Sequence, residues 1–275
     1  MTKRITFFAI VLTAVFFLQN CGSNIDMLIS DLYSKDKRPA AVTALSKTEP
    51  AKTFSRVYSV LGSHDDDTAN GAIEIMKAWK DKGVVEMIQK AMDETINIKE
   101  ARNSVRALAA IGGENAEDIL ISHINDERLE VGFEALNGLG ILGSKKSVGE
   151  IIKIVSADKI NDPRLPIALL ALGKIKEPSA VPALEEMLSK DISSYTLKIN
   201  LINTIFEIEP LRGYEITKAE LGTLSSSDPR YIVSVLNLLE KAGQKDCVEK
   251  LTALKKDLPG MADRIDKVIE AAKQR

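Results

Sequence analysis

The stretch that decides the fold is DPRLPIALLALGKIKEPSAVPALEEML, which runs from Asp162 to Leu188. Its opening, Asp162-Pro163, is typical of a helix start. Asp can cap the free backbone N–H groups of a first turn, and Pro loses no hydrogen bond there. We expect a first helix over residues 164–172, and we expect Gly173 to let the chain leave that helix.

A second helix follows after a short polar break. Glu177-Pro178 repeats the acidic-residue-and-proline start, and the same pair occurs far upstream as Glu49-Pro50. Val181, Leu184 and Leu188 then recur at the i, i+3, i+7 spacing that places apolar side chains on one helical face. The stretch therefore predicts a pair of helices.

The six-residue pattern inside the first helix recurs along the chain. It ends at residues 46, 80, 112, 140, 173, 206 and 240, so its spacings are 34, 32, 28, 33, 33 and 34 residues. A near-constant period of this length indicates a helical repeat array, and no stretch shows sustained strand alternation. The sequence therefore predicts an all-α chain. The seven copies read AVTALS at 41–46, IMKAWK at 75–80, ALAAIG at 107–112, ALNGLG at 135–140, ALLALG at 168–173, LINTIF at 201–206 and VLNLLE at 235–240.

The ALxxLG ending, the Asp-Pro-Arg helix start and the EPxAVPxL second helix resemble HEAT-like repeats, in particular the short form named after phycobilisome lyases. The resemblance covers about residues 38–258. It implies a right-handed α-solenoid (an α-α superhelix) of about seven helix pairs, with the second helices lining a concave surface. Tetratricopeptide repeats have a similar period, but Trp79 is the one tryptophan and their motif is absent.

The outer repeats depart from the pattern, as capping repeats do. Ser46, Lys80, Phe206 and Glu240 stand where the middle copies have glycine. We also expect a short capping helix at about 25–34 and a last helix from Met261 to Ala272. The predicted organisation is a removed signal at 1–20, a tether and capping helix at 21–37, one solenoid at 38–258 and a capping helix at 259–275.

The N-terminus predicts export. Lys3 and Arg4 precede fourteen uncharged residues, Ile5 to Leu18. Such a run is short for a membrane span, which needs about 20 apolar residues, and suits a secretory signal. The alternative is a buried core helix.

The run ends in Leu18-Gln19-Asn20-Cys21, which resembles the lipobox of bacterial lipoproteins. The resemblance implies that Cys21 carries acyl chains such as palmitate and becomes the first residue of a membrane-anchored chain. Gln19 and Asn20 depart from the small residues usual there, and the alternative is an incidental cysteine beside an ordinary cleavage site. Because neither Gly22 nor Ser23 is acidic, the resemblance favours the outer membrane over the inner one.

Composition excludes several classes of protein. Hydrophobic residues make up 45% and charged residues 28%, as in folded chains, whereas aromatic residues make up only 5%. Thin layers of small aliphatic side chains explain that low share. The formal charge is −2, and it is −4 without Lys3 and Arg4, which disfavours nucleic acid. Two cysteines and two histidines supply neither a disulfide framework nor a zinc site.

Candidate reactive groups are few. His64-Asp65-Asp66-Asp67 suits a calcium site or, as we expect, a loop in which Asp67 or Thr68 caps the next helix. We interpret His123 as solvated or packed and Cys247 as a packed thiol. The glycines that follow the helical patterns read as helix ends: Gly112, Gly113, Gly138, Gly140 and Gly143.

These patterns predict a function in binding. No catalytic motif and no nucleotide fingerprint is present, so we expect no catalytic, cofactor-binding or metal-binding residue and no enzymatic activity. The prediction is a lipid-anchored protein of the bacterial envelope that binds a protein or peptide through its concave face. The alternatives are an enzyme or ligand carrier related to HEAT-like bilin lyases, and a HEAT-like DNA repair protein.

Overall fold

The computed structural model describes residues 24–80, 83–156, 161–190, 192, 194–226 and 228–274. These residues form α-helices and short 3₁₀-helices and no strand, so the all-α prediction is confirmed. The predicted signal and Cys21 lie outside them. Within the same residues, no helix combines the length and the apolar character needed to cross a membrane. The chain divides into two compact units, Met1–Gly138 and Leu139–Arg275, and each is described by itself.

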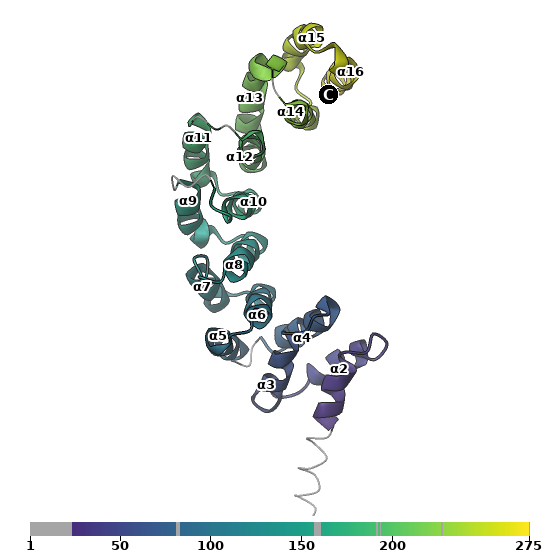
Figure 1. The fold of residues 1–275 in the computed structure, drawn as a ribbon, viewed down its shortest axis with the longest axis vertical. Coiled ribbons are helices and arrows are strands. Elements are labelled where there is room, and N and C mark those ends of the chain that lie inside the picture. The colour runs from purple at the N-terminus through teal and green to yellow at the C-terminus, as the bar shows by residue number, and fades with distance from the viewer. Residues whose placement is uncertain are drawn as a thin grey trace, which may run out of the picture. The chain divides into compact units, whose positions relative to one another are not determined.

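Unit 1 stacks its helices in two rows (Figure 1). One row packs α2 on α4 and α4 on α6, and the other packs α3 on α5 and α5 on α7. A helix over 24–31 comes first, close to the predicted capping helix. The remaining helices are α2 Arg38–Leu45, α3 Pro50–Val60, α4 Asp66–Ala78, α5 Val84–Glu94, α6 Ile98–Ile111 and α7 Glu114–Ser122.

Helix α8, Leu129–Leu142, begins in unit 1 and ends in unit 2. Beyond it, α10 packs on α12, α12 on α14 and α14 on α16. The helices of unit 2 are η1 Lys145–Ser147, α9 Val148–Ser156, α10 Leu165–Ile175, η2 Pro178–Ala180, α11 Val181–Ser189, α12 Tyr195–Ile208, α13 Pro210–Glu220, η3 Leu221–Ser226, α14 Pro229–Ala242, η4 Lys245–Cys247, α15 Val248–Asp257, η5 Pro259–Met261 and α16 Ala262–Lys273.

Each six-residue pattern from residue 75 onward lies at or near the end of the first helix of a pair. We call α4, α6, α8, α10, α12 and α14 the first helices, and α5, α7, α9, α11, α13 and α15 the second helices. The first helices pack on one another in succession within each unit, as a repeat stack requires. The predicted domain boundaries stay a prediction, since only the division into two units is observed.

The glycines of the pattern have a different role from the predicted one. Gly138, Gly140 and Gly173 lie inside their helices, and a Cβ on Gly140 would come 3.0 Å from Ala171 Cα in the neighbouring first helix. The absent side chain therefore allows close helix packing and does not end the helix. Helix α10 ends later, at Ile175, and Lys176 after it takes the left-handed conformation with a φ of 57°. Gly112, Gly113 and Gly143 do follow helix ends with positive φ, as predicted.

A short Asp-x-Arg turn starts several first helices. Asp162 Oδ1 accepts hydrogen bonds from Arg164 N at 2.9 Å and from Arg164 Nε at 3.0 Å. Asp126 and Asp228 bind the arginine two residues later in the same way. One carboxylate thus satisfies a backbone donor and fixes a guanidinium, so the recurring turn sets where each helix begins.

Candidate functional site

Unit 2 exposes large apolar side chains along its first helices. Leu170 on α10 is 55% exposed, Tyr195 on α12 is 42% exposed and Val233 on α14 is 36% exposed. Ile199 on α12 is half-buried beside them. Contiguous apolar surface on a soluble chain marks an interaction site, whereas scattered residues do not.

Ile199 and Val233 occupy matching positions of consecutive repeats, and Leu170 occupies a different position of its repeat. When the six-residue patterns are aligned, Leu170, Asn203 and Asn237 fall on one position, and Pro166, Ile199 and Val233 fall four residues earlier. Because α12 packs on both α10 and α14, the matching positions form rows that cross the three helices. We call this surface, carried by α10, α12 and α14, the ladder face.

A pocket of about 220 Å³ opens on the ladder face between the starts of α12 and α14. The rings of Tyr195 and Tyr231 stack with centroids 5.0 Å apart. Tyr231 is fixed from below, since its hydroxyl donates to Glu220 Oε2 at 2.7 Å, and burial raises the pKa of that phenol. The lining residues are Tyr195, Thr196, Ile199, Asp228, Arg230, Tyr231 and Ser234.

A charged row closes the other edge of the ladder face. Glu207 on α12 binds Lys241 of α14 and lies 3.7 Å from Lys176 Nζ, just past α10. The hydrogen bond from Lys241 holds the pKa of the Glu207 carboxyl below its usual range. Lys174 occupies the matching position on α10. Lys176 and Lys241 thus both contact the carboxylate of Glu207 along this edge.

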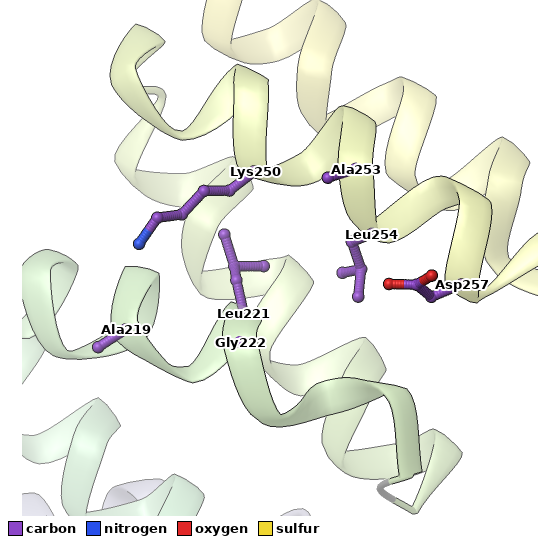
Figure 2. A pocket seen from close by; sticks show the side chains of 7 residues that line it. All are labelled: Ala219, Leu221, Gly222, Lys250, Ala253, Leu254 and Asp257. Carbon is purple, nitrogen blue, oxygen red and sulfur yellow. The ribbon is translucent and has the colours of Figure 1, made fainter.

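A second pocket of unit 2 lies between η3 and α15 and has a volume of about 270 Å³ (Figure 2). Leu221 and Leu254 lie in its middle, while Lys250 and Asp257 lie at opposite ends. Ligand sites for drug-sized molecules usually enclose about 300–1,000 Å³. Each of these two pockets therefore suits a side chain of a partner better than a whole cofactor.

The predicted site residues are dispersed. Cys21, the predicted lipidation site, lies outside the described residues. In the polar cluster, Asp65 and not Asp67 or Thr68 caps α4, and its carboxylate accepts from Thr68 N at 3.1 Å. His64 Nδ1 lies 2.8 Å from Lys99 Nζ. Within the described residues, no three His, Cys, Asp or Glu side chains are placed to hold a metal ion.

The remaining candidates are packed. His123 Nδ1 lies 2.8 Å from Ile119 O, and its Nε2 lies 3.4 Å from Asp93 Oδ1. Cys247 is fully buried at the start of α15, and burial raises the pKa of its thiol, which lowers its reactivity. Neither residue lies on the ladder face.

Sequence reasoning missed the ladder face. We expected the second helices to carry the binding surface, yet the exposed apolar side chains of unit 2 gather on the first helices, with Leu211 on α13 as the exception. The sequence did contain one signal of this face: an apolar residue at a helix position that the spacing of the buried residues does not include. Leu170 is such a residue, because Ala168, Leu169, Ala171 and Leu172 already supply the buried side of α10.

Comparison with protein families supports the repeat assignment. The model of the PBS lyase HEAT-like repeat matches residues 167–190, which covers most of α10 and all of α11. The chain therefore carries HEAT-like repeats, as the sequence predicted. No curated protein matches the chain.

Solved structures with similar helix arrangements have low sequence identity. The complex of CpcE and CpcF of phycocyanin lyase from Nostoc sp. PCC7120 aligns at 18% identity and a TM-score of 0.44, over 80% of this chain and 93% of that one. Importin beta aligns at 13% identity and a TM-score of 0.48, over 84% of this chain and 33% of that one. Human deoxyhypusine hydroxylase aligns at 14% identity and a TM-score of 0.39, over 92% and 97%.

The family match corrects one prediction. We expected no enzymatic activity because the chain shows no catalytic motif. The matched repeat is described by its occurrence in PBS lyases, so the missing motifs are no ground for excluding a lyase-type activity. The prediction of a chain without enzymatic activity is therefore wrong.

Proposed function

We propose that the chain is a lipid-anchored binding protein of a bacterial envelope, and that the ladder face holds its protein partner. The observation that carries the binding role is the exposed apolar surface that crosses three consecutive first helices. The anchor rests on the sequence alone: a basic start, an apolar run and Cys21 at its end. Several acyl chains on one cysteine hold a protein stably on a membrane.

Site-specific photo-crosslinking in the cells that make the protein tests the binding role. A photoreactive amino acid placed at Leu170 or Val233 should yield one dominant crosslinked protein. The matched control places it at Leu211, which is exposed on the second helix α13. Equal products from all three positions, or products from Leu211 alone, would contradict the assignment to the ladder face.

Fractionation of cells tests the anchor. Cys21→Ala should release the protein from the membrane fraction or stop its maturation, and it should abolish labelling by a fatty-acid analogue. Cys247→Ala is the control, since that thiol is buried and should leave labelling unchanged. Normal processing and membrane binding of Cys21→Ala would show that Cys21 is not the lipidated residue.

The family match supports a second candidate, a carrier or lyase that handles a bilin. Incubation with a bilin and a phycobiliprotein that has a free acceptor cysteine tests it. Covalent colour on the acceptor after denaturation, which depends on the folded chain, would support this candidate. Heat-unfolded chain is the control, and equal transfer by both samples would contradict it.

A further inference from the structure

We propose that residues 24–33, which we call the N-terminal cap, lie on the lipid surface that holds the anchor, with Met27 and Tyr33 in the headgroup layer. The inference rests on the proposed function, since it takes a lipid-bearing Cys21 as its starting point. Three features support it: two exposed apolar side chains, the short reach from Cys21 and the attachment of the cap to unit 1.

The N-terminal cap exposes large apolar side chains at an end of the repeat stack. Met27 is 57% exposed and Tyr33 is 56% exposed. A cap usually turns polar side chains to water. The C-terminal cap α16 does so, because its large apolar side chains Ile265, Val268 and Ile269 are buried. The two caps therefore differ, and the apolar one is the cap next to the predicted anchor.

The short chain between Cys21 and the cap sets how far the cap can lie from lipid. An extended chain spans at most about 3.6 Å per residue, so Asn24 lies within about 11 Å of Cys21. Acyl chains on Cys21 would enter the hydrocarbon core, and the headgroup layer over that core is about 5–8 Å thick. Met27 follows Asn24 by about 5 Å of helix, so its side chain is within reach of the headgroups.

The side chains of the cap suit the interface between water and lipid. Tyrosine is enriched there, since its ring is apolar and its hydroxyl is polar. The two carboxylates of the helix are paired, Asp26 with Arg56 at 2.9 Å and Asp31 with Lys37 at 3.2 Å. Residues 24–67 carry six basic and seven acidic side chains, so no surplus of cations attracts anionic lipid. The contact therefore depends on apolar surface.

Hydrogen bonds fix the cap to the rest of unit 1. The carbonyl oxygen of Leu32 accepts from Arg38 Nε at 2.8 Å and from Thr68 Oγ1 at 3.4 Å. These donors belong to α2 and α4, so the cap moves with both helices. Contact of the cap with lipid therefore holds the first helices of unit 1 beside the membrane, which acyl chains on a tether alone would not do.

Quenching of tryptophan fluorescence by brominated lipids tests the inference on the acylated chain purified from membranes. The vesicles contain phosphatidylethanolamine and phosphatidylglycerol with brominated acyl chains. Met27→Trp and Tyr33→Trp should each lose about half of the emission that the new indole adds, because interfacial side chains reach the edge of the acyl region. Ile96→Trp, at a 98% exposed position of unit 1, is the control and should lose none. Trp79 is fully buried and gives a constant background.

Mass spectrometry of Cys21 separates this inference from the anchor itself. If Cys21 carries acyl chains and neither new tryptophan is quenched, the inference is overturned and the anchor stands. If Cys21 carries none, the anchor and the inference fail together. Equal quenching of Ile96→Trp would contradict a contact made by the cap. Replacing phosphatidylglycerol by phosphatidylcholine should leave the quenching unchanged, and its loss would contradict an apolar contact.

Discussion

The first helices of the two units present different surfaces at matching positions of the repeat. In unit 1, Ile73 and Val105 are buried, whereas in unit 2 the matching Ile199 is half-buried and Val233 is exposed. Unit 1 also joins its first helices through Arg106, which donates to Asn70 of the neighbouring helix at 2.8 Å. The comparison teaches that one position of the repeat pattern can hold either a buried or an exposed aliphatic side chain.

The units also differ in their interiors. Unit 1 buries polar side chains between helices: Asn103 Nδ2 donates to Leu61 O at 2.7 Å, and Ser104 Oγ donates to Tyr58 Oη at 3.0 Å. The C-terminal core of unit 2 is formed mainly by aliphatic side chains of α12, α14, α15 and α16. Unit 2 also has such a bond between first helices, from Thr204 Oγ1 to Leu169 O at 3.4 Å, so buried hydrogen bonds contribute to the packing of both units.

Gly213→Ala should have the largest effect, and it should fall on unit 2. A Cβ at this position would lie 2.3 Å from Phe206 Cα and 2.7 Å from Phe206 N. Backbone atoms cannot rotate aside, so we expect the free energy of unfolding of unit 2 to fall by about 3 kcal/mol. Hydrogen exchange read by mass spectrometry checks it, because peptides of each unit report separately.

Gly149→Ala is the matched control, since nothing lies within 4 Å of an added Cβ in α9. Alanine is the better helix former, so this change should stabilise by up to about 1 kcal/mol. Equal loss of protection in unit 1 and unit 2 with Gly213→Ala would show that the chain unfolds as one body and would remove the basis of the comparison.

A rise to alkaline pH should have the second largest effect on stability. Burial raises the pKa of Tyr58 to about 12, whereas an unfolded tyrosine ionises near 10. Above pH 10 the unfolded chain releases this proton and the folded chain keeps it. The stabilisation is therefore complete below pH 10 and is lost as the pH rises to 12, by up to about 3 kcal/mol in unit 1.

Denaturant titrations at several pH values, followed by hydrogen exchange, measure this loss. Tyr58→Phe should remove the alkaline slope of unit 1. Unit 2 should fall more steeply, because burial raises the pKa of both Tyr214 and Tyr231. A slope in unit 1 that Tyr58→Phe leaves unchanged would assign the effect to another group.

Asn103→Leu should destabilise unit 1 by about 2 kcal/mol. Leucine has a similar shape, but it leaves the buried carbonyl of Leu61 without its donor. Asn203→Leu makes the same change at an exposed position of a first helix in unit 2, where we expect less than about 0.5 kcal/mol. Thermal unfolding of both variants gives the comparison. Equal losses of stability in the two variants would show that the hydrogen bond of Asn103 does not stabilise unit 1 in particular.

Much of the fold could be predicted from the sequence, because the pattern of one helix pair recurs several times along the chain and each copy supports the others. The packed state of Cys247 follows from local chemistry and was predicted. The end of α10 was placed too early, since Gly173 packs against α12 and only the neighbouring helix reveals this. The ladder face was missed for the same reason: exposure of Leu170 depends on which helices cover it.

Leu170→Lys should change stability least. Surface substitutions usually alter the free energy of unfolding by less than about 0.5 kcal/mol, and lysine is a good helix former. The change should, however, reduce self-association of the purified chain, because it places a charge where the ladder face exposes a large apolar side chain. Sedimentation velocity at rising concentration measures this.

Leu211→Lys is the control, since it removes an equally large exposed side chain from a second helix. If both variants reduce association equally, exposed apolar area alone governs it and the ladder face has no distinct role. If only Leu170→Lys reduces association, the ladder face of unit 2 is the surface through which the chain associates, and a partner would cover it.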